Sequence, residues 1–70
     1  MEFQLKADFI ELDNLLKMAK LAANGAHARE QIQSAQVKVN GKVESRIRRK
    51  LRLGDIIELN TEQIKIVKTE

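Results

Sequence analysis

The spacing of apolar residues is helical in the first half of the chain and alternating in the second, and this change of period limits the possible folds. Leu12, Leu15, Leu16 and Ala19 recur three or four positions apart, which is the stripe of an amphipathic helix. We expect this helix to run to about Ala23.

A second helix is predicted directly after the first. Asn24 can accept a hydrogen bond from the free amides of a first helical turn, and Gly25 follows it as a break between the two helices. Ala28, Ile32 and Ala35 would then face inward. Because the link between the helices is very short, we expect them to pack as an αα-hairpin.

Alternating polar and apolar residues predict strands in the remaining chain. The first is residues 2–6, with Phe3 and Leu5 on one side, and the others lie around residues 37–39, 57–59 and 64–66. A chain of about 60 residues buries only ~60% of its unfolded surface, so these 70 residues should form one domain, 1–70. The predicted fold class is α+β, with two short packed helices on a small antiparallel sheet.

The Asn-Gly pair at residues 40–41 is a strong turn signal, because both residue types tolerate positive φ. Two registers are possible for this hairpin. A two-residue turn would set Val39 opposite Lys42 and turn Val43 to the other face, whereas a three-residue connection would set Val39 opposite Val43. We favour the second register because it keeps the valines together.

Residues 37–52 concentrate positive charge. Seven basic residues stand there against the single acid Glu44, a net charge of +6, whereas the other six basic and nine acidic residues carry −3. If residues 46–53 are extended, the even positions carry a row of cations outward. The odd positions Ile47, Leu51 and Leu53 would then anchor the segment in the core, with Arg49 as the exception.

A one-sided cationic segment in an otherwise acidic chain is typical of a surface that binds polyanions. The alternative is a solvated face that only keeps the protein soluble. Duplex DNA and an acidic protein partner are further alternatives, because charge does not distinguish among polyanions. Base stacking is not expected, since Tyr and Trp are absent and Phe3 and Phe9, the two aromatic residues, are expected in the core.

No pattern for catalysis, metal or cofactor binding is present in the sequence. Cysteine is absent, His27 has no partner for a metal site or for general-base catalysis, and no Gly-rich phosphate loop occurs. The longest apolar run is Leu21–Ala23, much shorter than the ~20 residues of a membrane helix. We therefore expect a non-enzymatic cytoplasmic protein with no small-molecule substrate.

Three stretches, LDNLLK, GAHAREQI and VKVNGKVESRIRRKLRLGDII, together resemble the alpha-L RNA-binding motif, the ribosomal S-four-type RNA-binding domain. The resemblance covers residues 12–57 and is strongest for the small free-standing bacterial members. It departs from the ribosomal type at Glu11 and Gly25, where basic residues are usual. It implies binding of structured RNA, namely ribosomal RNA or ribosome-assembly particles, by the second helix and the hairpin after it.

The resemblance points to Lys17, Arg29, Lys38, Arg46 and Lys50 as RNA contacts. Gln33 is added as a hydrogen-bonding group one turn from Arg29, and the remaining cations of residues 37–52 are added for their charge. The full set of predicted RNA-binding residues is Lys17, Arg29, Gln33, Lys38, Lys42, Arg46, Arg48, Arg49, Lys50 and Arg52.

Overall fold

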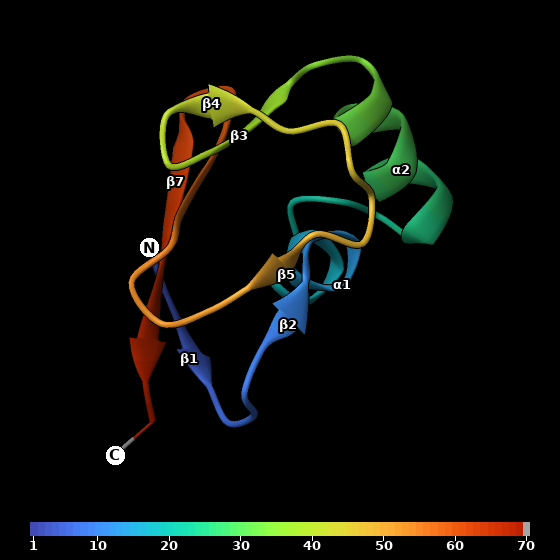
Figure 1. Ribbon diagram of the computed structural model, residues 1–70. Helices are drawn as coiled ribbons and strands as arrows, with labels where there is room; N and C mark the ends of the chain where they lie inside the picture. Colours follow the sequence, from blue (N-terminus) through green and yellow to red (C-terminus); the bar gives the residue numbers. More distant parts are fainter. Residues whose placement is uncertain (70) are drawn as a thin grey trace.

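The apolar stripes of the two helices are buried against one face of a five-stranded sheet in the computed structural model, which describes residues 1–69 (Figure 1). The elements follow one another as β1 (Glu2–Leu5), β2 (Ile10–Glu11), α1 (Leu12–Met18), α2 (Gly25–Gln33), β3 (Val37–Val39), β4 (Lys42–Val43), β5 (Lys50–Leu51), β6 (Ile56–Leu59) and β7 (Glu62–Lys68).

The core is made by helical positions at the predicted spacing and by alternate strand positions. Both patterns put apolar side chains on one side only, so helices and sheet can cover each other. The fully buried large side chains are Leu12, Leu15, Leu16, Ile32, Val37, Leu51, Ile57, Ile64 and Ile66. The predicted α+β class with two packed helices is confirmed.

The five-stranded sheet has the order β1-β7-β6-β3-β4, and β2 and β5 form a separate antiparallel pair. The sheet is mixed and not purely antiparallel, because β1 runs parallel to β7, with Phe3 opposite Ile66. The two ends of the chain therefore supply neighbouring strands (Figure 1). Alternation shows which face a strand buries but does not specify its neighbour, so this pairing was not predicted.

Helix α1 ends at Met18 and not near Ala23 as predicted. Its end is a Schellman motif: Lys20 has φ 62°, its N–H donates to Lys17 O at 3.0 Å, and Leu21 N–H donates to Leu16 O at 2.9 Å. Glycine usually occupies such a left-handed position, so a lysine there gave no stop signal in the sequence.

Helix α2 begins as predicted, since the Asn24 side chain accepts a hydrogen bond from His27 N–H at 2.8 Å. Its end differs from the prediction, because Ala35 has φ 61° and is exposed. Gln31 is buried instead, and its Nε2 donates to Leu21 O at 3.0 Å. This bond ties α2 to the segment that follows α1.

The β3–β4 hairpin has the two-residue turn, so the register that we favoured is wrong. Val39 pairs with Lys42, and Val43, which pairs with Lys38, is 53% exposed. Asn40 and Gly41 have φ 53° and 84°, which matches the right-handed twist of a tight hairpin. The geometry of the turn thus decides the register, at the cost of leaving one valine in water.

Residues 46–53 are not one strand. Residues 47–48 form a turn, only Lys50–Leu51 is paired as β5, and Leu53 is exposed, so its predicted role as a core anchor is wrong. Leu51 is fully buried, as predicted, and Ile47 packs against the core. The cations therefore lie on a folded loop and a short strand.

Candidate nucleic-acid interface

The loop that carries the arginines is fastened to the start of helix α1 by its backbone. Leu12 N–H donates to Arg49 O at 2.9 Å, and Asp13 N–H donates to Ile47 O at 3.1 Å. The first amides of a helix lack partners within the helix, and Glu11 provides no side-chain cap here. Carbonyl groups of the loop supply these partners, which fixes the loop without using its side chains.

Strand β5 fastens the next part of the basic segment. Ile10 pairs with Leu51, and Glu11 pairs with Lys50, in the antiparallel β2–β5 ladder. Since Leu51 points into the core, its neighbours Lys50 and Arg52 must point to the opposite side, and both are exposed. The alternation predicted for these positions is confirmed.

Glu44, the one acid of the basic segment, organises two of the arginines. It is buried, and its Oε1 accepts hydrogen bonds from Arg46 Nε at 2.9 Å and from an Arg49 terminal nitrogen at 3.1 Å. Burial acts to raise the pKa of Glu44, but the hydrogen bonds and positive charges of the two arginines outweigh it, and the pKa is lowered below 4.5. The carboxylate is therefore ionised at neutral pH and holds both guanidinium groups.

Every residue that lines the hollow beside this loop is basic. The hollow has a volume of about 550 Å³ and opens to solvent between Arg46, Arg48, Arg49, Lys50 and Arg52. We call the hollow lined by these five residues the basic hollow. Within the described residues, Arg48, Lys50 and Arg52 form no ion pair, although Glu11 lies opposite Lys50 in the β2–β5 ladder and Arg52 donates to Asp8 O at 3.4 Å. Like charges gathered around one opening favour an anion there.

Half of the predicted site residues lie outside the basic hollow. Lys17 is in the last turn of α1, Arg29 and Gln33 lie one turn apart on α2, and Lys38 and Lys42 lie on the β3–β4 hairpin. All five side chains are exposed. Lys38 is opposite Glu58 of β6, whose negative charge offsets part of the positive charge of Lys38. These positions stay predictions of RNA contact.

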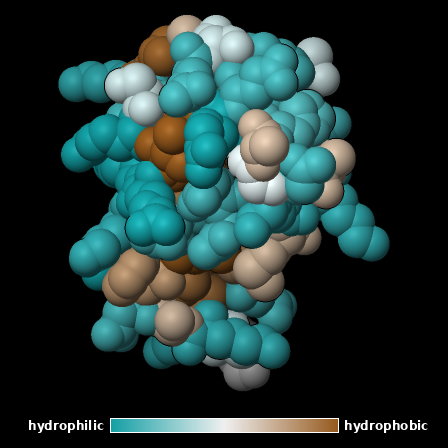
Figure 2. Space-filling model, turned by 90° about the vertical axis from the view of Figure 1, so that its right-hand side faces the viewer, coloured by the Kyte–Doolittle hydropathy of each residue, from teal (hydrophilic) through white to brown (hydrophobic). Residues whose placement is uncertain are grey.

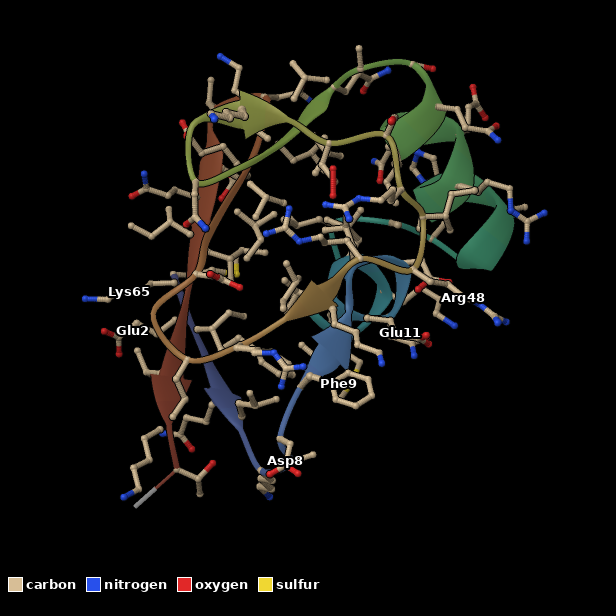
Figure 3. All side chains as sticks on the ribbon, in the orientation of Figure 1. Glu2, Asp8, Phe9, Glu11, Arg48 and Lys65 are labelled. Atoms are coloured by element: carbon tan, nitrogen blue, oxygen red, sulfur yellow. The ribbon has the colours of Figure 1, made fainter. Side chains whose placement is uncertain are left out.

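Phe9 lies beside the basic hollow and not in the core, so its predicted burial is wrong. It is 36% exposed, with Lys50 Nζ 4.9 Å and Arg52 Cζ 5.7 Å from the centre of its ring. Figure 3 shows the ring projecting outward from the chain just before β2. Phe3, by contrast, packs against the core as predicted. Sequence periodicity gave no signal for Phe9, because it lies in the irregular segment between β1 and β2.

We also searched residues 1–69 for a metal site and for a membrane-spanning helix. No group of three or more His, Cys, Asp or Glu side chains there is placed to hold a metal ion. No helix in this part of the chain has the length and apolar character needed to cross a membrane. The Nδ1 of His27 accepts a hydrogen bond from Ala23 N–H at 3.0 Å, so this side chain serves the start of α2.

Comparison with known proteins agrees with this geometry. A family model described as the S4 domain matches residues 3–67. The solution structure of YbcJ from E. coli superposes with a TM-score of 0.73 and 36% sequence identity, over 94% of this chain and 85% of that one. That structure is reported to reveal an αL motif involved in RNA-binding. No curated protein matches the sequence.

Proposed function

The chain belongs to the S4 domain family, and we propose that it acts as a single, non-catalytic domain that binds structured RNA through the basic hollow. The observation that carries this proposal is that Arg46, Arg48, Arg49, Lys50 and Arg52 alone line a hollow of about 550 Å³. A surface without a neutral or acidic lining residue suits a phosphate backbone. The RNA-binding motif reported for YbcJ supports the choice of RNA.

The chemistry of binding is phosphate neutralisation. Each cation that replaces a condensed counterion of the RNA releases that ion, which supplies affinity and makes it depend on salt. The Arg46 and Arg49 guanidinium groups are held in place by Glu44 before RNA arrives. Less side-chain freedom is therefore lost on binding, and their planar forks suit the oxygens of a phosphate.

Recognition of a fold and not of a sequence follows from this chemistry. Double-stranded RNA exposes phosphates and 2′-hydroxyls more than base edges, so proteins read it mainly by shape. Arg29 and Gln33, exposed one turn apart on α2, add hydrogen-bonding groups to the proposed surface. We take ribosomal RNA or a ribosome-assembly particle as the target, which the resemblance to the ribosomal S-four-type domain supports and which would locate the protein in the cytoplasm.

Binding to an RNA hairpin and to a DNA duplex of matched sequence, measured by fluorescence anisotropy over a range of salt, tests the proposal. If four to six phosphates are contacted, log affinity against log salt should have a slope of about −3 to −5, with RNA preferred. A flat salt response would exclude the basic hollow as the binding surface. Preference for DNA at physiological salt would overturn the assignment to RNA. Binding to an acidic protein that survives RNase treatment, without RNA affinity, would favour an adaptor.

A further inference from the structure

A second hollow, mainly apolar, adjoins the basic one. Its volume is about 380 Å³, and Phe3, Leu5, Phe9, Ile10 and Met18 line it together with a few short or polar neighbours. Met18 is 64% exposed although it is a large apolar residue. Figure 2 shows hydrophobic residues interrupting the hydrophilic surface in the lower half of the face on the right of Figure 1. The volume of this second hollow is within the range of ~300–1,000 Å³ found for ligand pockets.

Phe9 lines the apolar hollow and contacts two residues of the basic hollow. Its ring lines the apolar hollow, while Lys50 Nζ at 4.9 Å and Arg52 Cζ at 5.7 Å approach it from the basic hollow. The apolar surface is thus continuous with the surface proposed for phosphates. In a nucleic acid strand, each base is joined through one sugar to its phosphate. A strand whose phosphates contact Lys50 and Arg52 would therefore bring a base to the Phe9 ring.

We infer that Phe9 is a stacking platform for an unpaired base next to the bound RNA helix. This inference rests on the proposed function and adds a nucleotide subsite to it. A base that stacks on an aromatic ring gains affinity whatever its identity, because every base has a π-face. The polar side chains lining the hollow are only Gln4 and Lys6, so the subsite should accept any of the four bases.

Charge and apolar surface together favour a base over other occupants. An apolar side chain of a protein would fill the hollow equally well but would gain nothing from Lys50 and Arg52. A base stacked on the ring, with its phosphate beside Lys50 and Arg52, would use both the apolar surface and the two charges. The cations above the ring also attract its π-electrons, which holds Phe9 oriented. The preferred ligand is accordingly an RNA helix with a single-stranded extension, and not a blunt helix.

Three RNA ligands separate base stacking from charge. The first is a blunt-ended hairpin. The second is the same hairpin with a short unpaired extension at its 5′ or 3′ terminus. The third carries the same extension without its bases, so that only the sugars and phosphates remain. Wild-type protein should bind the second RNA more tightly than the other two. Phe9→Leu, which keeps an apolar side chain, should reduce affinity for the second RNA by about 5- to 150-fold, the loss expected for one stacked base.

Two controls complete the experiment. Affinity of Phe9→Leu for the blunt hairpin, and its circular dichroism, should match those of the wild type. Because the chain contains no Trp, Phe9→Trp gives a single fluorophore, whose emission should be quenched by the second RNA and not by the base-free one.

Three results would contradict the inference that Phe9 stacks on a base. One is that wild-type protein binds the second and third RNAs with equal affinity. Another is that Phe9→Leu loses the same affinity for all three RNAs, which would mean that Phe9 only holds Lys50 and Arg52 in place. Equal quenching of Phe9→Trp by the base-free RNA would likewise exclude stacking. If wild-type protein binds the blunt hairpin in a salt-dependent manner, these results leave the proposed function intact. If it binds none of the RNAs, the proposed function itself fails.

Discussion

Glu44 accepts a hydrogen bond from Arg49, five residues further along the chain, at 3.1 Å. The only acid of the basic segment thereby becomes a fixed part of its structure, buried beneath the two arginines that it holds. Such an arrangement lets closely spaced cations coexist in the free protein, because one negative charge offsets part of their repulsion. It also links the stability of the loop to pH.

Acid should remove the contribution of Glu44 to stability. Its pKa in the folded protein is lowered below 4.5, its value without partners. The stabilisation is therefore complete above about pH 4.5 and is lost as the pH falls through the lower folded-state pKa. Urea unfolding of wild type and Glu44→Gln should show the wild type more stable at neutral pH, with the difference shrinking below pH 4.5. A difference independent of pH would contradict the ionic role of Glu44.

Charge reversal in the basic hollow should weaken RNA binding without unfolding the protein. Arg48→Glu combined with Lys50→Glu changes two exposed cations that form no ion pair within the described residues. The slope of log affinity against log salt should become shallower by about 1.4 to 1.8 if each cation contacts one phosphate. The thermal midpoint should stay within a few degrees of the wild type.

The matched control reverses the same charge elsewhere. Lys65 and Lys68 are exposed on β7, and Figure 3 shows Lys65 on the opposite side of the molecule from Arg48. Lys65→Glu with Lys68→Glu therefore alters the net charge equally and should leave the salt slope nearly unchanged. An equal loss in both double variants would mean that overall charge, and not the basic hollow, controls the affinity.

Removing side chains from the helical core should cost much more stability than removing them from the surface. Leu16 and Ile32 are fully buried, one from each helix. Leu16→Ala or Ile32→Ala should each lower the free energy of unfolding by about 2 to 5 kcal/mol, since each loses apolar contacts and leaves a cavity. Met18→Ala, an exposed position of α1, should change it by less than about 0.5 kcal/mol. Chemical denaturation measures all three variants.

Local signals in the sequence predicted the local structure well. The stripe through Leu12 and Leu16 and the cap at Asn24 depend only on residues within a turn or two, and both are confirmed. The parallel pairing of β1 with β7 joins segments some sixty residues apart, which alternation does not encode. Val43 shows the limit of binary patterns, because turn geometry at Asn40 overrode the tendency to bury it.

The sequence predicted where the positive charge of the candidate site lies, but not how the side chains of the site are arranged. Counting cations located the segment that includes Arg46 to Arg52, and the structure brings five of them around one hollow. The sequence did not indicate that Glu44 would hold two of these arginines, although its isolation among seven basic residues was the available signal. Phe9 gave no such signal. Its exposure follows from the path of the segment between β1 and β2, which depends on the whole fold.

Asn40 should be needed for its side chain as well as for its backbone. It has φ 53°, its Nδ2 donates to Asp55 Oδ1 at 3.0 Å, and its Oδ1 accepts from Ile56 N–H at 2.9 Å. Asn40→Gly keeps the left-handed turn but loses both bonds, at a cost of roughly 1 kcal/mol in this exposed setting. Asn40→Ala also strains the turn and should cost about 1 kcal/mol more.

Two measurements separate these contributions. Chemical denaturation gives the order of stability, expected to be wild type, then Asn40→Gly, then Asn40→Ala. Amide hydrogen exchange at Ile56 reports the lost bond directly and should accelerate in both variants, because its acceptor is the Asn40 side chain. Unchanged exchange at Ile56 would mean that the side chain does not tie the β3–β4 hairpin to β6. Equal stability of the two variants would mean that the left-handed turn carries no strain with alanine.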